Sequence, residues 1–192
     1  PAIMVQMIQD MLEKGELVES DEMLRYDHMT ASRDTIRPMQ LEELFNDQIA
    51  RLSESHRKLL NWIEVLDKDS YLEVLRFIAD LRESQLLKML NELLFKNLIT
   101  CNTDTGGENY AISGPVLSLV LSRSIDPVTV REMHLDIIGV LRDLGIDYAN
   151  PARLGYHQER AGQYEEACRS YLTATRDLMT QNLNYRAVEV IE

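Results

Sequence analysis

Apolar residues recur every three or four positions along most of the chain, which is the spacing of one face of an α-helix. In the middle of the chain Pro38 can open the first such helix, and Ser53 can cap the second. Ser70 and Glu73 have the spacing of a capping box and predict a third helix start, and a fourth helix is expected over residues 84–97. The expected inner faces are Leu41, Leu44, Phe45, Ile49 and Leu52; Leu59, Trp62, Ile63 and Leu66; Leu72, Leu75 and Ile78; and Leu86, Leu87, Leu90, Leu93 and Leu94.

The apolar period changes after these helices. Residues 98–102 (LITCN) and 109–113 (NYAIS) are typical of strands, and the glycine pair between them permits a turn with positive φ. Three helices followed by a two-stranded hairpin is the order of elements in a winged helix, a relative of the helix-turn-helix.

Helical spacing then returns. Gly114–Pro115 and Asp126–Pro127 each predict a helix start, and Gly145 can end the second helix. The expected faces are Val116, Leu117, Val120 and Leu121, then Val130, Met133, Ile137, Leu141 and Leu144. Asn150–Pro151 opens a helical hairpin, and a further helix is expected after Asn182.

The helical hairpin carries small and aromatic residues at the positions where two antiparallel helices pack closely. In order they are Leu154, Gly155, Gly162, Tyr164, Ala167, Tyr171 and Ala174. This order resembles a tetratricopeptide repeat. Because one repeat cannot bury its own apolar face, we expect the chain to be a piece of a longer array.

The first part of the chain is predicted to hold a helix, a small hairpin and a linker. The helix is indicated by Ile3, Met4, Met7, Ile8, Met11 and Leu12, with Gly15 placed to stop it. Leu17–Val18 and Met23–Tyr26, separated by a polar turn, predict the hairpin. Residues 27–37 are polar without a clear period and are expected to form the linker.

Composition and charge narrow the function classes. The 192 residues include 32 acidic and 20 basic side chains, a net charge of −12, and such a chain repels a phosphate backbone. Cys101 and Cys168 lie in unrelated contexts, so we expect two buried, reduced thiols. No apolar run approaches the ~20 residues of a membrane span. The start of the chain lacks the features of a signal peptide, and we expect the cytoplasm and no membrane contact.

The sequence contains no pattern that indicates catalysis or metal binding. The four histidines His28, His56, His134 and His157 are scattered over a linker and three helices, without metal-ligand spacing. The carboxylate pairs Glu42–Glu43 and Glu165–Glu166 occupy adjacent helical positions that point about 100° apart, so we expect solvated faces. A phosphate-binding loop and a nucleophile elbow are both absent from the sequence. We therefore predict no enzymatic activity, no catalytic residues and no metal site.

Four segments in order carry a resemblance to a known family: PAIMVQMIQDMLEKGELV, IRPMQLEELFNDQIARLSESHRKLL, LLKMLNELLFKNLITCN and the repeat-like hairpin. Together they resemble the middle of a STAND-class signalling ATPase. These are AAA-related proteins found as bacterial LuxR-type regulators and beside nucleotide cyclase or Ser/Thr kinase domains. The resemblance implies a mainly α fold with a small β-hairpin and three parts. Residues 1–37 would be a remnant of the ATPase's helical lid with a hairpin and linker. Residues 38–125 would be a linker helix with a winged-helix domain, and residues 126–192 a helical connector with the start of a TPR-like α-α superhelix.

The same resemblance places the nucleotide-binding domain upstream, so ATP or ADP would belong to the parent protein and no cofactor is expected in this chain. Pro1 occupies the position of the family's adenine-contacting proline and is the candidate cofactor-binding residue.

The helix predicted over residues 84–97 would be the DNA-reading element of a winged helix. Its polar side carries Glu83, Ser84, Gln85, Lys88, Asn91, Glu92 and Lys96. Two lysines balanced by two glutamates, followed by an acidic turn at residues 102–109, make a poor footprint for DNA. We expect a protein-packing module, since in the family it resembles this domain docks on the nucleotide domain and holds the resting state.

The leading hypothesis is therefore a non-catalytic coupling segment that relays signals, through protein–protein contacts, between an upstream nucleotide-binding domain and downstream repeats. Such a segment is expected to expose apolar side chains at its two ends, with Ile3, Met7, Met11, Tyr185, Val188 and Ile191 as candidates. One alternative is a DNA-binding winged-helix transcription regulator. Another is an adaptor with a peptide groove, which would need neighbouring repeats.

Overall fold

The structure is a computed structural model that describes residues 17–20, 23–26, 38–104, 107–145 and 150–180. Over these residues the chain is mainly helical, with eight α-helices, a short 3₁₀ turn and two separate two-stranded antiparallel sheets. The predicted mainly α class is confirmed. No helix within the described ranges is both long enough and apolar enough to cross a membrane. The predicted N-terminal helix, the linker and the helix after Asn182 lie outside the described residues.

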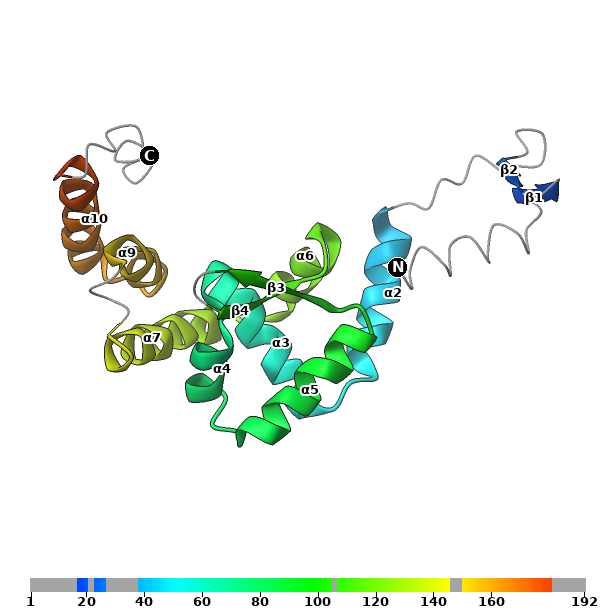
Figure 1. Cartoon of the computed structure of the whole chain (residues 1–192), viewed down its shortest axis with the longest axis horizontal. Helices are drawn as coiled ribbons and strands as arrows, with labels where there is room; N and C mark the ends of the chain where they lie inside the picture. Colours follow the sequence, from blue (N-terminus) through cyan, green and yellow to red (C-terminus); the bar gives the residue numbers. More distant parts are fainter. Residues whose placement is uncertain (1–16, 21–22, 27–37, 105–106, 146–149, 181–192) are drawn as a thin grey trace.

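Figure 1 shows the arrangement of the elements along the chain. They are β1 (Leu17–Ser20), β2 (Met23–Tyr26), α2 (Pro38–Ala50), α3 (Glu54–Leu66), η1 (Asp67–Asp69), α4 (Leu72–Ile78), α5 (Glu83–Phe95), β3 (Ile99–Asp104), β4 (Gly107–Ile112), α6 (Pro115–Ser124), α7 (Pro127–Asp143), α9 (Pro151–Arg160) and α10 (Tyr164–Thr180). The predicted N-terminal hairpin is confirmed, because β1 pairs antiparallel with β2.

One apolar core joins α2 through α7 with the β3–β4 hairpin, and we call residues 38–104 and 107–145 the core unit. Its buried side chains come largely from the predicted helix faces: Phe45, Leu52, Leu59, Ile63, Leu66, Leu75, Leu86, Leu90, Leu93, Leu117, Leu121, Met133, Ile137 and Leu141. Leu44 is the clearest exception among the predicted positions, since its side chain is exposed. The helical period therefore placed most of the core correctly.

The N-caps predicted at Ser53 and Asp126 are present, and Asn150, predicted with Pro151 to open a helix, caps α9. The Ser53 hydroxyl accepts from the His56 amide at 3.3 Å, and one Asp126 carboxylate oxygen accepts from the two amides of residues 128 and 129. The Asn150 side chain accepts from the Arg153 amide at 3.3 Å. Each side chain satisfies amides that the first helical turn leaves without partners, and so fixes where its helix begins.

The capping box predicted at Ser70 is wrong. α4 begins at Leu72, and Ser70 is fully buried, with a hydroxyl that has no hydrogen-bond partner among the described residues. The backbone of this segment pairs with the β-hairpin instead. The Tyr110 amide donates to the Ser70 carbonyl at 2.9 Å, and Tyr71 forms an isolated bridge with Asn109. Because this pairing holds the segment against the hairpin, the Ser70 side chain does not bond to the free amides of the first turn of α4.

The β3–β4 hairpin confirms the predicted strand pair and extends it toward the turn, with Ile99 opposite Ile112 and Asp104 opposite Gly107. The hairpin is also attached to the turn after α3, because the Asn109 side-chain amide donates to the Lys68 carbonyl at 2.9 Å.

α9 and α10 pack as the close antiparallel pair that their small residues predict, and we call them the C-terminal hairpin. Gly155 lies against the Tyr171 ring, and Ala167 and Ala174 are buried. Gly162 forms the turn with φ +78°, a value that favours glycine. Tyr164 differs from the expected packing, since its side chain is exposed.

α7 belongs to two apolar clusters. Met133, Ile137 and Leu141 lie in the core unit, while Ile138 packs with Leu154 and Ala161 of the C-terminal hairpin. In Figure 1 the C-terminal hairpin accordingly lies at one end of the core unit, next to α7. α7 is thus the helix on which the C-terminal hairpin is positioned.

Both cysteines are free thiols, but the prediction that they are buried is wrong, because both are exposed. Cys101 lies on β3 in a sheet of only two strands, so its strand has an open edge. Cys168 follows Ala167, which faces α9, and one helical step turns its side chain about 100° away from that contact.

Candidate functional site

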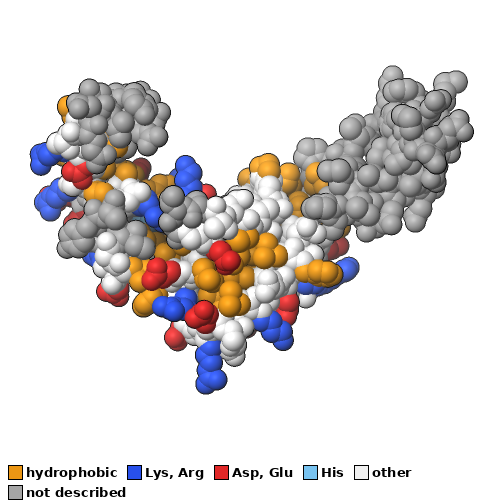
Figure 2. Space-filling model, in the orientation of Figure 1, with side chains coloured by type: hydrophobic (Ala, Val, Ile, Leu, Met, Phe, Trp, Pro, Cys, Tyr) orange, Lys and Arg blue, Asp and Glu red, His pale blue; other side chains and the backbone are white. Residues whose placement is uncertain are grey.

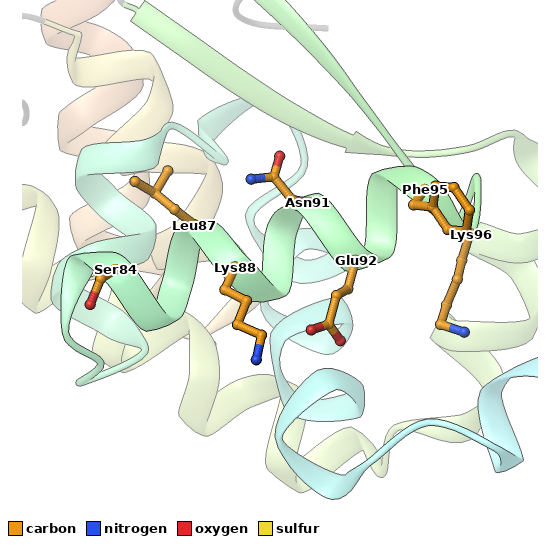
Figure 3. Close-up of a pocket in the computed structure, with 7 residues that line it drawn as sticks. All are labelled: Ser84, Leu87, Lys88, Asn91, Glu92, Phe95 and Lys96. Carbon is orange, nitrogen blue, oxygen red and sulfur yellow. The ribbon is translucent and has the colours of Figure 1, made fainter.

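The side of α5 that faces away from the core forms an open groove. Leu86, Leu90 and Leu93 anchor the buried side of the helix. The groove on the other side is lined by Ser84, Leu87, Lys88, Asn91, Glu92, Phe95 and Lys96, and Figure 3 shows these side chains along the helix. These positions are spaced by three or four residues, so they share one helical stripe.

Phe95 is the outstanding side chain of this groove, because 88% of it is exposed. Burying a phenylalanine is worth about 1.5–3 kcal/mol, so this position gains from any partner that covers it. Leu87, half-buried in the same groove, extends the apolar surface toward the start of α5. Sequence reasoning placed neither residue in the site. A signal was present, since position 95 follows Asn91 by four and Lys88 by seven residues.

The charges around the groove are mixed. Lys88 and Lys96 line it together with Glu92, whose carboxylate contacts the His56 ring at 3.1 Å. At the start of the helix Glu83 pairs with Arg76 at 3.7 Å. Figure 2 shows the same character, with apolar side chains gathered on the visible face of the core unit between Lys or Arg and Asp or Glu side chains. The predicted polar side of α5 therefore also carries two apolar side chains, Leu87 and Phe95, among residues of mixed charge.

A second site is a buried polar chain between the core unit and the C-terminal hairpin. His157 on α9 places its Nε2 at 2.9 Å from Oδ2 of Asp69 in η1, and its Nδ1 at 2.9 Å from Nδ1 of His134 on α7. All three side chains are buried. The three groups come from elements far apart in the sequence, so only the fold brings them together.

The hydrogen-bond geometry fixes where the protons lie. An ionised Asp69 carboxylate accepts only, so His157 must carry its proton on Nε2. The two Nδ1 atoms then share one proton: one nitrogen donates it and the other accepts. With both rings neutral, His134 is the donor to His157. These tautomers are assigned from the hydrogen-bond network.

Burial changes the pKa of two groups in and beside this cluster, His134 and Tyr156. Removal from water disfavours the imidazolium form and lowers the pKa of His134 to about 4, and the nearby guanidinium of Arg160 acts in the same direction, as a positive charge on His157 would. The ring of Tyr156 packs edge-on against both imidazoles, and burial raises the pKa of its hydroxyl. At neutral pH His134 is therefore an uncharged hydrogen-bonding group.

Two arginines make further contacts next to this buried cluster of Asp69, His157 and His134. Arg153 pairs with the other Asp69 oxygen and lies over the Tyr71 ring, with its guanidinium carbon 5.2 Å from the ring centroid. Arg131 of α7 donates from Nε to the Ala161 carbonyl at 2.7 Å, at the turn of the C-terminal hairpin. The buried cluster thus joins η1, α7 and α9.

The predicted histidine positions are partly confirmed. His56, His134 and His157 lie on three helices, but the fold brings His134 and His157 into contact, so they are not scattered in space. Helical spacing contained the signal, since His134 precedes buried Ile138 by four and His157 follows buried Leu154 by three. Asp69 carried no such signal. Among the described residues, no three His, Cys, Asp or Glu side chains are arranged to hold a metal ion.

The remaining predicted site residues do not come together. Glu42 pairs with Arg123 of α6 at 3.4 Å, and Glu165 pairs with Arg169 along α10. Pro1 lies outside the described residues, as do His28 and the six candidate apolar positions at the two ends of the chain. Comparison with protein-family models, characterised proteins and solved structures finds no match for this chain.

Proposed function

We propose that this chain is a non-catalytic coupling segment of a cytoplasmic STAND-type ATPase. In this proposal α3–α5 and β3–β4 form a winged helix, and the C-terminal hairpin begins a TPR-like array. The order of elements supports this assignment. The observation that carries the functional part is the exposed Phe95 in the open groove of α5, and the occupant we assign to the groove is the upstream nucleotide-binding domain of the parent protein.

The composition of the groove favours a protein partner over DNA. A DNA-reading helix presents arginine and lysine to phosphates and base edges, and affinity grows with each phosphate neutralised. Here the charges of Lys88 and Lys96 are opposed by Glu92, and the most exposed side chain is aromatic. Phenylalanine is enriched at the centres of protein interfaces, from which charged residues are depleted. The lysines can then contact acidic groups at the rim.

The architecture also offers a route for coupling. A relay requires contacts that differ between two states of the molecule. The α5 groove is a contact that can be made or lost, and α7 packs both on the core unit and on the C-terminal hairpin. A displacement of the repeat array would therefore act on the core unit through α7 and change how α5 meets its partner.

The decisive experiment uses the full-length protein and compares two substitutions. Phe95→Asp places a charge in the groove, whereas Phe77→Asp changes a partly exposed phenylalanine on α4 that does not line it. Loss of about 1.5–3 kcal/mol of apolar burial changes the docked-to-free ratio by roughly tenfold or more. We expect Phe95→Asp to raise the ATP hydrolysis rate severalfold and Phe77→Asp to leave it unchanged. Equal rates for both variants and the unaltered protein would overturn the proposal.

A second measurement addresses the DNA-binding alternative. Fluorescence anisotropy with a labelled duplex at low salt is expected to show no saturable binding by this chain. Tight binding that weakens with added salt, and that Lys88→Gln or Lys96→Gln reduces, would instead support a transcription regulator.

A further inference from the structure

We propose that Asp69, His157 and His134 form a proton-sensitive latch, which holds the C-terminal hairpin on the core unit in neutral solution and releases it on acidification. This latch goes beyond the coupling function proposed above. It is argued only from residues within the chain, so it can be tested without the parent protein.

The apolar contact between the two parts is small. The buried apolar cluster that α7 shares with the C-terminal hairpin consists of Ile138, Leu154 and Ala161, whereas the core unit buries more than twenty apolar side chains around its own centre. Two of the three side chains are large, and one is an alanine. Polar contacts must therefore contribute a considerable part of the attachment.

Those polar contacts converge on His157. Its ring is completely buried and touches Asp69 on the core unit through one nitrogen and His134 through the other. The Arg153–Asp69 ion pair crosses the same boundary. Separating the C-terminal hairpin from the core unit therefore breaks all of these contacts in one step.

The hydrogen bonds that link Asp69, His157 and His134 can all be kept only when these side chains carry a limited number of protons. His157 needs a proton on Nε2 to reach Asp69, and the two Nδ1 atoms at 2.9 Å need one proton between them. One further proton leaves these hydrogen bonds in place, because either ring can then be the cation, but it puts a positive charge in a buried site and so weakens docking. A second further proton puts two N–H groups of two cations face to face. That state is incompatible with the docked geometry.

The surrounding charges do not compensate for added protons. The groups that face the cluster, directly or as its neighbours in the same interface, are Asp67, Asp69, Glu64, Tyr71, Tyr156, Arg131, Arg153 and Arg160. The Asp69 carboxylate is already shared by His157 and Arg153, and Arg160 opposes a positive charge on His134. Glu64 has a raised pKa because of burial, which favours its neutral form. New positive charge thus lacks a free buried anion.

The direction of the pH effect follows from His134. Its pKa is about 4 when docked, below the ordinary histidine value of 6.5 that applies when the side chain is in water. The docked state is therefore fully favoured above pH 6.5 and loses this contribution as the pH falls from 6.5 toward 4. For one such group the docking equilibrium constant falls roughly tenfold or more between pH 8 and pH 5.

The two native cysteines provide a direct assay. Cys101 lies on β3 of the core unit and Cys168 on α10, and both are exposed free thiols. Nitroxide labels on both permit the distance across the boundary to be measured by pulsed electron paramagnetic resonance on the full 192-residue chain. We expect one narrow distance population at pH 8 and a broad second population that grows below pH 6.5. Circular dichroism at each pH establishes that the helices remain folded.

Two variants identify the group responsible. His134→Asn keeps a donor near the position of Nδ1 but cannot be protonated, so its distance distribution should change severalfold less with pH. His56→Asn is the matched control. It removes a histidine that contacts Glu92 on α5 rather than the C-terminal hairpin, and it should follow the unaltered chain.

The pH series on the unaltered chain decides the proposal even if His134→Asn fails to dock. A distance distribution that stays constant down to the pH at which helicity is lost would refute the latch. A docked His134→Asn with the same pH response as the unaltered chain would also refute it.

Discussion

Gly155 offers the sharpest quantitative prediction from this structure. A β-carbon built at position 155 lies 2.9 Å from both Cδ1 and Cε1 of Tyr171, whereas carbon atoms pack best at about 3.5–4.0 Å. The ring cannot move away freely, because the Tyr171 hydroxyl donates to Glu159 at 2.9 Å. Gly155→Ala must therefore push α9 and α10 apart or displace the ring from its hydrogen bond.

Two opposing terms decide the magnitude. Replacing glycine by alanine inside a helix stabilises by about 1 kcal/mol, while forcing an additional group into a packed contact costs about 1–3 kcal/mol. Gly139 provides the matched control: it lies within α7, it is exposed, and a β-carbon there meets no atom within 4 Å. We expect Gly139→Ala to stabilise by up to about 1 kcal/mol and Gly155→Ala to destabilise by roughly 1 kcal/mol.

The sign should reverse when the obstacle is removed. In a Tyr171→Ala background the clash is absent, so Gly155→Ala is expected to stabilise, with a coupling energy of about 1–3 kcal/mol across the double-mutant cycle. Urea unfolding followed by circular dichroism measures each free energy of unfolding, and hydrogen exchange of the α9–α10 amides localises the effect. If Gly155→Ala stabilised the chain as much as Gly139→Ala does, the close packing of this hairpin would be refuted.

Three other substitutions or reactions test separate features. Ser70→Ala should leave the urea midpoint unchanged or raise it, because the buried hydroxyl has no partner among the described residues and its removal loses no hydrogen bond; a loss above about 1 kcal/mol would show that it is bonded. Burial raises the pKa of Glu64, which accepts a hydrogen bond from Ser118, so its ionised form opposes folding at neutral pH. Glu64→Gln should then stabilise at pH 7 but not below about pH 4, and equal urea midpoints at pH 7 would contradict this. Cys101 and Cys168 should both react with a thiol reagent in the absence of denaturant, and a count of fewer than two reactive thiols would show that one is protected.

The inner faces and the helix starts could be predicted because they are set by residues within one or two helical turns of each other. Ser53 and Asp126 cap their helices as predicted, and Asn150 caps the helix that it was predicted to open with Pro151, because a cap bonds to amides two or three residues away. Gly155 and Gly162 likewise indicated a close helix pair and a turn before any tertiary contact was known. These signals lie in neighbouring residues.

The candidate sites were harder to predict. The polar members of the α5 groove were found by sequence, but Phe95 was missed because a large apolar side chain at that spacing is usually taken to be buried. The convergence of His134, His157 and Asp69 was also missed. Both histidines carry a periodic signal, yet their meeting depends on how α9 packs on α7 and on where η1 ends.

The sequence by itself determined the helices, their inward faces, the β3–β4 hairpin and most of the caps, because hydrophobic period and capping act locally along the chain. Only the tertiary structure decided that Ser70 pairs with the hairpin rather than capping α4, that both cysteines are exposed, and that two histidines and an aspartate share a buried hydrogen-bond chain. The physical reason is the same in each case. Burial and long-range hydrogen bonds depend on which surfaces of the fold come into contact. Local sequence patterns do not indicate which distant residues will meet.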